Sequence, residues 1–320
     1  MQERELDSLL ILKPENVTYI SGYKPSGMSI IIVKDEATLY TSTMEMEDAL
    51  NKSRISLNEY SSLDQIKKDL NGRVGIEVSM PISLYKKIYH DYETKVTDLV
   101  ESLRIKKTPD EVKYIQRAVK IAEDSLLETE FNGTENKVAA RLEYNMKSNG
   151  SIKPSFETIV ASGKRSSIPH STISPNNLET PVVIDWGAVY NNYCSDITRT
   201  LIESEKESEI FNIVLEAQKE AIKVIKPGIK ASYVDKVARN VIEESGYGKD
   251  FIHSTGHGLG LEIHENPAIS KNSEFRLQKG MVITVEPGIY IKDQFGIRIE
   301  DDVLVKNRGK VLTNIKKVIN

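Results

Sequence analysis

The chain has 320 residues, of which 39% are hydrophobic and 28% are charged. A chain of this length and composition is expected to fold into about two globular domains. Its formal net charge of -4 argues against a protein that binds nucleic acid through a basic surface. The single cysteine, Cys194, excludes an internal disulfide, and no apolar run approaches the roughly 18 residues of a membrane span. Composition therefore predicts a cytoplasmic protein without a nucleic-acid or membrane partner.

Residues 1–103 are predicted to form a small α/β domain. Two β-rich runs are separated by Asp35 and Glu36, which indicates a hairpin. The expected elements are strands at 28–34, 37–42 and 73–78 and helices at 64–70 and 83–92. The domain is expected to end at residue 103, because the following residues lead directly into a strong helix start.

That helix start has three parts. Thr108 can act as the cap, Pro109 occupies the first helical position, and Glu111 completes a capping box. Apolar residues then recur at spacings of three and four as far as Leu126, which predicts one buried helix face.

Residues 104–320 are predicted to contain one arrangement twice, namely two helices followed by two strands that carry two acidic residues. The expected helices begin at Thr108, at Thr134, at Ser208 and at Ser232 with Asp235, and the expected strand pairs are 182–190 with 193–203 and 281–291 with 297–305. The repeat predicts two carboxylate-bearing hairpins around a pseudo-two-fold axis. A chance recurrence of the same order is the alternative.

The first hairpin is predicted to bring two aspartates together. Asn191-Asn192 is a plausible two-residue turn, because asparagine tolerates the left-handed conformation that such turns need. That turn would place Asp185 opposite Thr198 and Asp196 opposite Gly187. The two aspartates would then be diagonal neighbours on one face, with Cβ atoms about 7 Å apart or less.

The second hairpin is predicted to do the same with two glutamates. If residues 292–296 form a five-residue loop, Gly288 pairs with Glu300, and Glu286 and Glu300 become diagonal neighbours. The loop length is an assumption, and a change of one residue would put the two glutamates on opposite faces.

Four carboxylates and one or more histidines would then converge. Such a set can hold two divalent ions about 3.5–4 Å apart, bridged by carboxylates and by a water that ionises near neutral pH. Hard oxygen ligands favour Mn²⁺, while imidazole also suits Co²⁺, Fe²⁺ or Zn²⁺. A surface or turn carboxylate is the alternative for each residue alone, but four on matching hairpins favour a metal site.

Three of the five histidines lie within twelve residues, at His253, His257 and His264. The first two are four apart, as in helical zinc proteases, but the His-Glu-x-x-His pattern is absent and the glycines in 256–260 disfavour a helix. These glycines also lack the spacing of a dinucleotide-binding loop. We interpret them as positions where the backbone approaches a metal site closely.

At these residues the sequence resembles the pita-bread (creatinase and aminopeptidase P-like) metallopeptidases, and among them most of all the Xaa-Pro dipeptidases, or prolidases. The similarity rests on the blocks VIDWGAVYNNYCSDITRT (183–200), TGHGLGLEIHE (255–265), TVEPGIY (284–290) and GIRIED (296–301). The resemblance implies an α+β chain, with a creatinase-like domain at residues 1–103 and a pita-bread catalytic domain at residues 104–320.

The resemblance also implies a metal-binding role for five residues. Asp185 would bind one metal ion, Asp196 and Glu300 would bridge both ions, and His257 and Glu286 would complete the second. Glu286 would also move a proton from the bridging water to the departing proline nitrogen.

Five further roles follow from the same resemblance. His264 would hydrogen-bond the scissile carbonyl or its oxyanion, and His253 and His170 would line the substrate pocket. Arg298 would support the ligands from behind, and Thr198 would orient the ligands or the water.

The implied activity is hydrolysis of Xaa-Pro bonds by a hydroxide that bridges two divalent ions, with short proline-containing peptides as substrates. Among these peptides, Xaa-Pro dipeptides are the substrates expected first. However, many prolidases have an arginine shortly after the His-Glu pair, where this chain has Ala268. An Xaa-Pro aminopeptidase acting on longer peptides is therefore the alternative. A non-catalytic peptide-binding protein is a second alternative, although such proteins typically lose metal ligands.

Two further expectations concern assembly. The family usually begins with a full helix, whereas only Met1–Ser8 precede the strand expected at Leu9–Lys13. Either the first domain is trimmed or the natural start lies upstream. The family often forms homodimers, so a homodimer is expected, with contacts that trimming would weaken.

Overall fold

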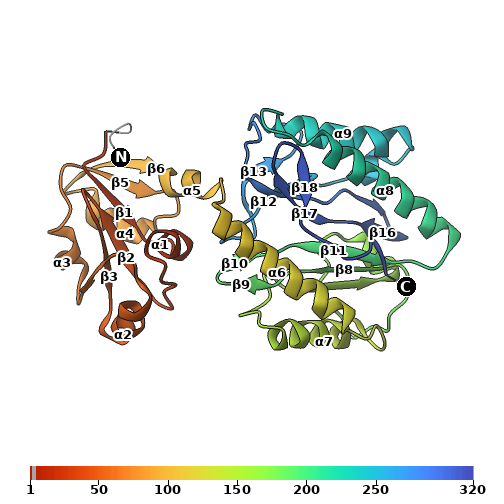
Figure 1. Cartoon of the computed structure of the whole chain (residues 1–320), viewed down its shortest axis with the longest axis horizontal. Coiled ribbons are helices and arrows are strands. Elements are labelled where there is room, and N and C mark those ends of the chain that lie inside the picture. The colour runs from red at the N-terminus through yellow and green to blue at the C-terminus, as the bar shows by residue number, and fades with distance from the viewer. Residues whose placement is uncertain (2–4, 320) are drawn as a thin grey trace. The chain divides into compact units, whose positions relative to one another are not determined.

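The computed structural model describes residue 1 and residues 5–319, and the chain divides into two compact units between Arg104 and Ile105 (Figure 1). The boundary predicted from the sequence lies one residue earlier. Each unit has its own apolar clusters and is described by itself. Within the described residues, no helix is both long enough and apolar enough to cross a membrane.

The N-terminal unit is built on a six-stranded sheet with the order β4-β3-β2-β1-β5-β6. Its strands are β1 (Ser8–Ile11), β2 (Ile30–Val33), β3 (Ala37–Thr41), β4 (Ser56–Glu59), β5 (Arg73–Glu77) and β6 (Glu93–Thr97). Its helices are α1 (Pro14–Ser21), α2 (Thr43–Lys52), α3 (Leu63–Lys67), α4 (Ile82–Ile88) and α5 (Leu99–Arg104). The predicted hairpin is confirmed, because β2 pairs antiparallel with β3.

Alternation along the central strands explains how this sheet is covered on both faces. Leu10 and Ile32 belong to the apolar cluster that includes α3 and α4, whereas Leu9 and Ile31 belong to the cluster that includes α1, α2 and α5. Successive side chains of a strand point to opposite faces, so each face receives its own helices.

A buried carboxylate on α2 fixes a loop of this unit. Glu45 accepts hydrogen bonds from the backbone N–H groups of Ser26 at 2.7 Å and Gly27 at 2.8 Å, and from the hydroxyl of Ser29 at 3.2 Å. Burial alone would raise the pKa of Glu45. The hydrogen bonds from this loop have the larger combined effect and lower the pKa to about 2.

We expect Glu45→Gln to lower the free energy of unfolding of the N-terminal unit by about 1–2 kcal/mol at neutral pH. A carboxyl group with a lowered pKa in the folded state stabilises above its ordinary pKa of 4.5 and loses that contribution as the pH falls toward 2. The difference between wild type and variant should therefore shrink below about pH 4.5. Urea unfolding followed by far-UV circular dichroism at several pH values measures it. Glu47→Gln, an exposed change on the same helix, is the matched control, and a difference that persists at low pH would contradict the argument.

The second unit contains four long helices, α6 (Pro109–Leu127), α7 (Glu135–Ser148), α8 (Glu205–Val224) and α9 (Ala231–Glu244), and the short 3-10 turns η2 (Gly163–Ser167) and η3 (Gly248–Asp250). The predicted capping box of Thr108 and Glu111 is confirmed. A second capping box, of Ser204 with Glu207, starts α8 three residues before the predicted Ser208.

The predicted cap at Ser232 is wrong. Helix α9 begins at Ala231 and the residue at its cap position is Lys230. The helix starts earlier because the backbone N–H of Ala231 donates to the carbonyl oxygen of Phe275 at 2.8 Å, so a tertiary contact replaces a side-chain cap. Asp235 instead pairs with Arg239 inside the helix.

The strands of this unit form a four-stranded sheet (β19-β11-β8-β7), a five-stranded sheet (β13-β12-β14-β17-β18) and two short two-stranded pieces. Their bounds are β7 (Ile159–Ser162), β8 (Val182–Trp186), β9 (Val189–Tyr190), β10 (Tyr193–Cys194), β11 (Ile197–Leu201), β12 (Gly256–Gly258), β13 (Glu265–Ile269), β14 (Val282–Val285), β15 (Gly288–Ile291), β16 (Phe295–Arg298), β17 (Asp301–Val305), β18 (Gly309–Val311) and β19 (Val318–Ile319). Each of the four long strands predicted from the sequence is thus interrupted.

Three of the four interruptions fall at acidic residues, for a common reason, and the fourth falls at Gly187-Ala188. Asp196, Glu286 and Glu300 lie between strand pieces, and their backbone N–H groups donate outside their own hairpins. The acceptors are Asp302 Oδ2 at 3.1 Å for Asp196, the Thr255 carbonyl at 2.8 Å for Glu286, and the Thr198 carbonyl at 3.1 Å for Glu300. These acidic residues therefore stand where separate strands meet.

The register of the first hairpin is confirmed. Asn191 and Asn192 have φ angles of 48° and 69°, and Asp185 pairs with Thr198. Left-handed backbone at both central residues matches the right-handed twist of the flanking strands.

The register of the second hairpin is not the predicted one. Gly288 pairs with Arg298 and Ile291 with Phe295, so the loop has three residues instead of five. Asp293, with φ of 61°, supplies the left-handed position that the shorter loop needs. A shift of two residues keeps every side chain on its face, so the predicted convergence of the two glutamates is unaffected.

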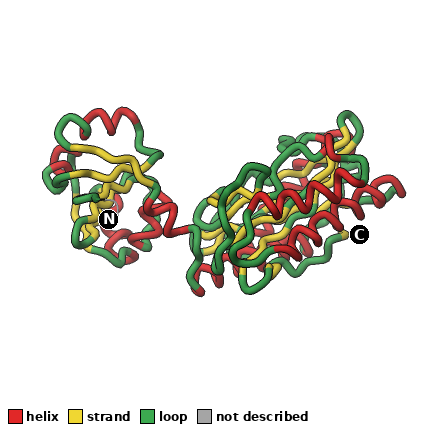
Figure 2. The backbone as a smooth tube through the Cα atoms, turned by 90° about the horizontal axis from the view of Figure 1, so that it is seen from above, coloured by secondary structure: helices red, strands yellow, loops and turns green. Residues whose placement is uncertain are grey.

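The helices of this unit lie in two layers with the strands between them. Figure 1 shows α8 and α9 on one side and α6 and α7 on the other, and the view from above shows helices lying over the strands (Figure 2). Two separate apolar clusters fill the two halves, one with α8 and α9 and one with α6 and α7. The predicted helix–helix–hairpin repeat is therefore confirmed.

Candidate active site

A cavity of about 680 Å³ lies in the second unit where the interrupted strands meet. Of the predicted site residues, it is lined by His170, Asp185, Asp196, His253, His257, His264, Glu286, Arg298 and Glu300. Thr198 is fully buried behind this lining. Apolar side chains complete the walls, among them Phe156, Ile173 and Ile263.

Three predicted ligands already have the spacing of a metal site. Asp196, His257 and Glu300 offer ligand atoms that all lie within 4.8 Å of one another. His257 Nε2 is 3.5 Å from Asp196 Oδ2 and 3.4 Å from Glu286 Oε1. His257 Nδ1 lies 3.0 Å from the Gly258 carbonyl, which can only accept, so Nδ1 carries the proton and the Nε2 lone pair faces the carboxylates.

Two carboxylate oxygens in the site are buried without a hydrogen-bond partner in the described part of the chain, Asp185 Oδ1 and Glu300 Oε1. The second oxygen of each group is engaged, Asp185 Oδ2 by Arg298 at 2.6 Å and Glu300 Oε2 by the Thr198 hydroxyl at 2.7 Å. A buried anionic oxygen without a partner is costly, and a cation satisfies it. The donor set therefore fits divalent metal ions.

Electrostatics favour cation binding as well. Burial, followed by repulsion from neighbouring carboxylates, raises the pKa values of Asp196 and Glu300 well above their ordinary range. Burial also raises the pKa of Glu286 to about 7. The same loss of water lowers the pKa values of His257 and His264, which favours neutral imidazole. Bound cations would relieve the repulsion among the carboxylates.

Arg298 holds the ligands from behind. Its Nε donates to the Thr198 hydroxyl at 3.0 Å, its Nη2 to Asp185 Oδ2, and its Nη1 to the Tyr290 hydroxyl at 2.7 Å. The planar guanidinium therefore orients Asp185 directly, and Glu300 through Thr198.

Tyr290 is a site residue to which the sequence analysis gave no role. Its hydroxyl lies 2.9 Å from His253 Nε2, and His253 Nδ1 lies 2.8 Å from the Ser254 carbonyl. His253 therefore has its proton on Nδ1 and accepts from Tyr290, which accepts from Arg298. Burial raises the pKa of Tyr290 to about 12 and lowers that of His253 to about 3. The only signal in the sequence was the place of Tyr290 in the TVEPGIY block.

The remaining histidines stand at the more exposed part of the cavity. The rings of His264 and His257 meet edge to face with centroids 4.3 Å apart, so His264 is next to the candidate ligands. His170 is exposed and belongs to the loop after η2. Both side chains can reach a molecule bound in the cavity.

Comparisons with known proteins agree with this geometry. The model of metallopeptidase family M24 matches residues 112–307, and the creatinase/prolidase N-terminal domain matches residues 1–106. The Xaa-Pro dipeptidase of Pyrococcus furiosus is 45% identical over 334 residues, covering 99% of this chain and 96% of that protein.

Solved structures agree over the same length. The prolidase from Pyrococcus furiosus matches with a TM-score of 0.94 and 45% identity, covering 99% of this chain and 98% of that one. The X-Pro aminopeptidase from Thermotoga maritima matches with a TM-score of 0.91 and 36% identity, covering 99% of both chains. The five residues predicted as metal ligands line one cavity, and the matches extend along the whole chain, which belongs to metallopeptidase family M24.

Proposed function

We propose that this chain, a metallo-exopeptidase, hydrolyses the bond before proline in short Xaa-Pro peptides. The observation that carries the proposal is the convergence of Asp185, Asp196, His257, Glu286 and Glu300 on one cavity, with unpartnered carboxylate oxygens among them. The names of the dipeptidase and aminopeptidase relatives support the substrate class.

We assign the roles as the sequence suggested. Asp185 would hold one ion, Asp196 and Glu300 would bridge two, and His257 and Glu286 would complete the second. When bound, two divalent ions supply Lewis acidity and lower the pKa of a bridging water toward neutrality. Mn²⁺ or Co²⁺ is proposed first, with Zn²⁺ or Fe²⁺ as alternatives, because the donors are mostly hard oxygens with one imidazole.

The chain's own residues move the proton and seat the peptide. Glu286 lies in the cavity beside His257, where its carboxylate can accept the proton of the attacking water and donate it to the proline nitrogen. That donation matters because the amide of an Xaa-Pro bond has no N–H and its nitrogen must be protonated to leave. His264 would stabilise the oxyanion, while His253 and His170 would line the peptide site.

The length of the preferred peptide depends on how the cavity receives the end of the substrate. Ala268 lines the cavity, and Arg298 is already committed to Asp185, Thr198 and Tyr290. These two facts favour the aminopeptidase alternative, because neither residue offers a free cation to a dipeptide carboxylate. The 45% identity to a named Xaa-Pro dipeptidase favours dipeptides, which we place first.

The deciding assay compares Met-Pro with Met-Pro-Ala, each incubated with the Mn²⁺-loaded protein. We expect Met-Pro to be cleaved, with release of proline detected by chromatography. Preferential cleavage of Met-Pro-Ala would replace the dipeptidase assignment with an aminopeptidase. Bound metal without cleavage of either peptide would contradict the Xaa-Pro assignment and favour a peptide-binding protein.

Three expectations from the sequence stay predictions. The division into a creatinase-like domain at residues 1–103 and a catalytic domain at 104–320 is supported by the two family matches. A homodimer is testable by analytical ultracentrifugation of the full chain. A reducing cytoplasmic location is supported by the cysteine content, because the single cysteine, the buried Cys194, cannot form an internal disulfide.

A further inference from the structure

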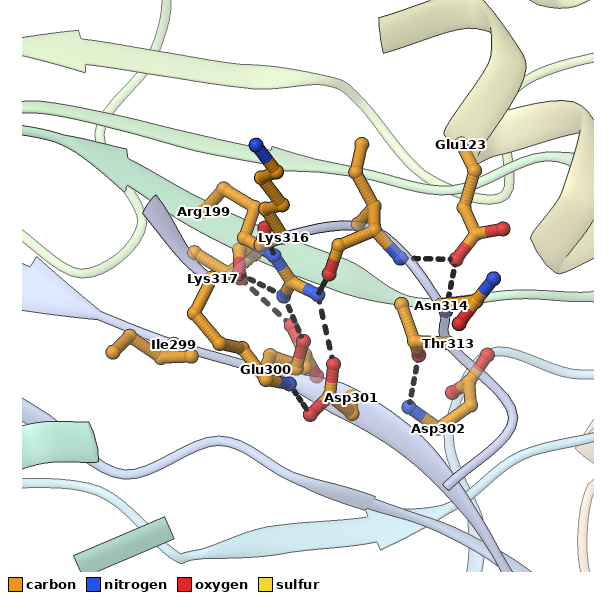
Figure 3. A network of polar contacts seen from close by, with 12 residues as sticks. Glu123, Arg199, Ile299, Glu300, Asp301, Asp302, Thr313, Asn314, Lys316 and Lys317 are labelled. Carbon is orange, nitrogen blue, oxygen red and sulfur yellow. Dashed lines mark hydrogen bonds and ion pairs between the residues drawn. The ribbon is translucent and has the colours of Figure 1, made fainter. Parts of the chain in front are cut away.

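Figure 3 shows a network of polar contacts that joins Arg199, Glu300 and Asp301 to the segment 313–317. At its centre, Arg199 of β11 is 0% exposed and directly follows Thr198, the partner of Glu300. Its Nη1 donates to the carbonyl oxygens of Thr198 at 2.8 Å and Glu300 at 2.6 Å, and its Nη2 pairs with Asp301 at 2.9 Å. One guanidinium therefore joins the backbones of two strands that carry candidate ligands.

The same guanidinium contacts the segment near the C-terminus. Its Nε donates to the Lys316 carbonyl at 2.9 Å and its Nη2 to the Ile315 carbonyl at 3.3 Å. The amino group of Lys317 contacts Oδ2 of Asp301, the carboxylate oxygen that Arg199 does not contact. Asp301 is thus held by the Arg199 guanidinium from β11 and by the Lys317 amino group from the segment 313–317.

A second connection leads from the segment to Asp196. The Thr313 hydroxyl accepts a hydrogen bond from the backbone N–H of Asp302 at 3.2 Å. The Asp302 carboxylate in turn accepts the backbone N–H of Asp196 at 3.1 Å. Asp196 and Glu300, the two residues assigned as bridging ligands, are therefore the two that this network reaches.

The segment itself is anchored on both sides. Glu123 of α6 accepts the backbone N–H groups of Asn314 and of Ile315, the second at 2.8 Å. Beyond the segment, β19 pairs with β11, with Val318 next to Thr200. The position of the segment 313–317 is therefore determined by helix α6 and by the sheet that contains β11. The segment can serve as a fixed support.

We propose that residues 313–317 form a positioning element of the metal centre, acting through Arg199 on Glu300 and through Asp302 on Asp196. The proposal rests on the assignment of Asp196 and Glu300 as bridging ligands. Groups behind a ligand fix its orientation, and their loss typically lowers metal affinity about 10–100-fold. A planar guanidinium with several donors suits this task, because it restrains several oxygens at once.

The first test is Arg199→Lys, which keeps the charge but cannot contact all five acceptors. We expect the Mn²⁺ affinity of the metal-free full chain, measured by isothermal titration calorimetry, to fall about 10–100-fold. The exposed change Arg308→Lys is the matched control and should leave the affinity unchanged. Wild-type affinity in Arg199→Lys would overturn the proposal.

Two milder variants separate positioning from a merely structural role. Thr313→Val removes the acceptor for the Asp302 N–H, and Lys317→Met removes the amino group that contacts Asp301. Both should weaken Mn²⁺ binding and change the visible absorption of the Co²⁺-loaded protein at temperatures where the fold is intact. A lower unfolding midpoint with wild-type affinity and an unchanged Co²⁺ spectrum would mean that the segment only stabilises the fold, and would overturn the proposal.

The metal titration tests the positioning role independently of the proposed peptidase function. It needs no peptide, so failure of the wild-type protein to cleave Met-Pro and Met-Pro-Ala would overturn the Xaa-Pro assignment alone. Unchanged Mn²⁺ affinity in all three variants would overturn the positioning role alone.

Discussion

Glu286→Gln is expected to lower kcat/KM for Xaa-Pro peptides by about 10²–10⁴-fold, the usual contribution of a positioned acid or base. Glu286 Oε1 lies 3.4 Å from His257 Nε2 and accepts a hydrogen bond from the Thr284 hydroxyl at 3.2 Å, so its carboxylate is held inside the candidate centre. Burial raises the pKa of Glu286 in the metal-free site, and a bound divalent cation would lower it again, so that the carboxylate could act as a base. Glutamine keeps the shape of the side chain but cannot carry the proton.

The measurement is the rate of proline release in excess Mn²⁺, with metal content determined on the same samples. Metal content is needed because glutamine is also a weaker ligand, and a variant that retains metal isolates the loss of proton transfer. Glu274→Gln is the matched control, because Glu274 is exposed and pairs with Lys230 at the surface. A metal-loaded Glu286→Gln protein with near wild-type kcat/KM would rule out the proton-transfer role.

Arg298→Met should lower the free energy of unfolding of the metal-free second unit by about 3–5 kcal/mol, as expected when one partner of a buried ion pair is removed. Arg298 is 3% exposed, and its loss would leave the Asp185 carboxylate buried without its cation at 2.6 Å. The variant would also remove a donor from Thr198 and one from Tyr290.

Urea unfolding in the presence of a chelator measures this effect. Trp186 is the single tryptophan of the chain, follows Asp185, and is fully buried, so its fluorescence reports on this unit. Arg298→Lys should be intermediate, because lysine keeps the charge and loses the planar fork. The exposed Arg276→Met is the control and should unfold like the wild type. Equal stability of Arg298→Met and wild type would show that the Arg298 cation does not stabilise the Asp185 carboxylate.

Local signals in the sequence were sufficient for several features of the fold. The capping box at Thr108, the hairpin at 28–42 and the turn at Asn191-Asn192 each depend on a few neighbouring residues, and the structure has all three. The pairing of Asp185 with Thr198 then followed from counting along two strands. Short-range geometry of this kind is fully encoded in adjacent side chains.

Two of the errors arose where a distant part of the chain supplied the decisive contact, and the third arose from a loop of ambiguous length. The Ser232 cap failed because Phe275 accepts the first N–H of α9. The loop after Ile291 was predicted two residues too long, since nothing adjacent to it distinguishes three residues from five. The long strands were predicted without interruptions because a sequence does not show that Asp302 takes the N–H of Asp196.

The sequence by itself determined that the two carboxylates of each hairpin share a face, because alternation along a strand depends only on residue parity, and parity survives a two-residue error in register. The tertiary structure alone decided how those side chains are held. Arg298 holds Asp185, which lies 113 residues earlier in the chain, and Arg199 contacts Lys316, which lies 117 residues later. Such contacts depend on the packing of whole elements, which local propensity and spacing do not specify.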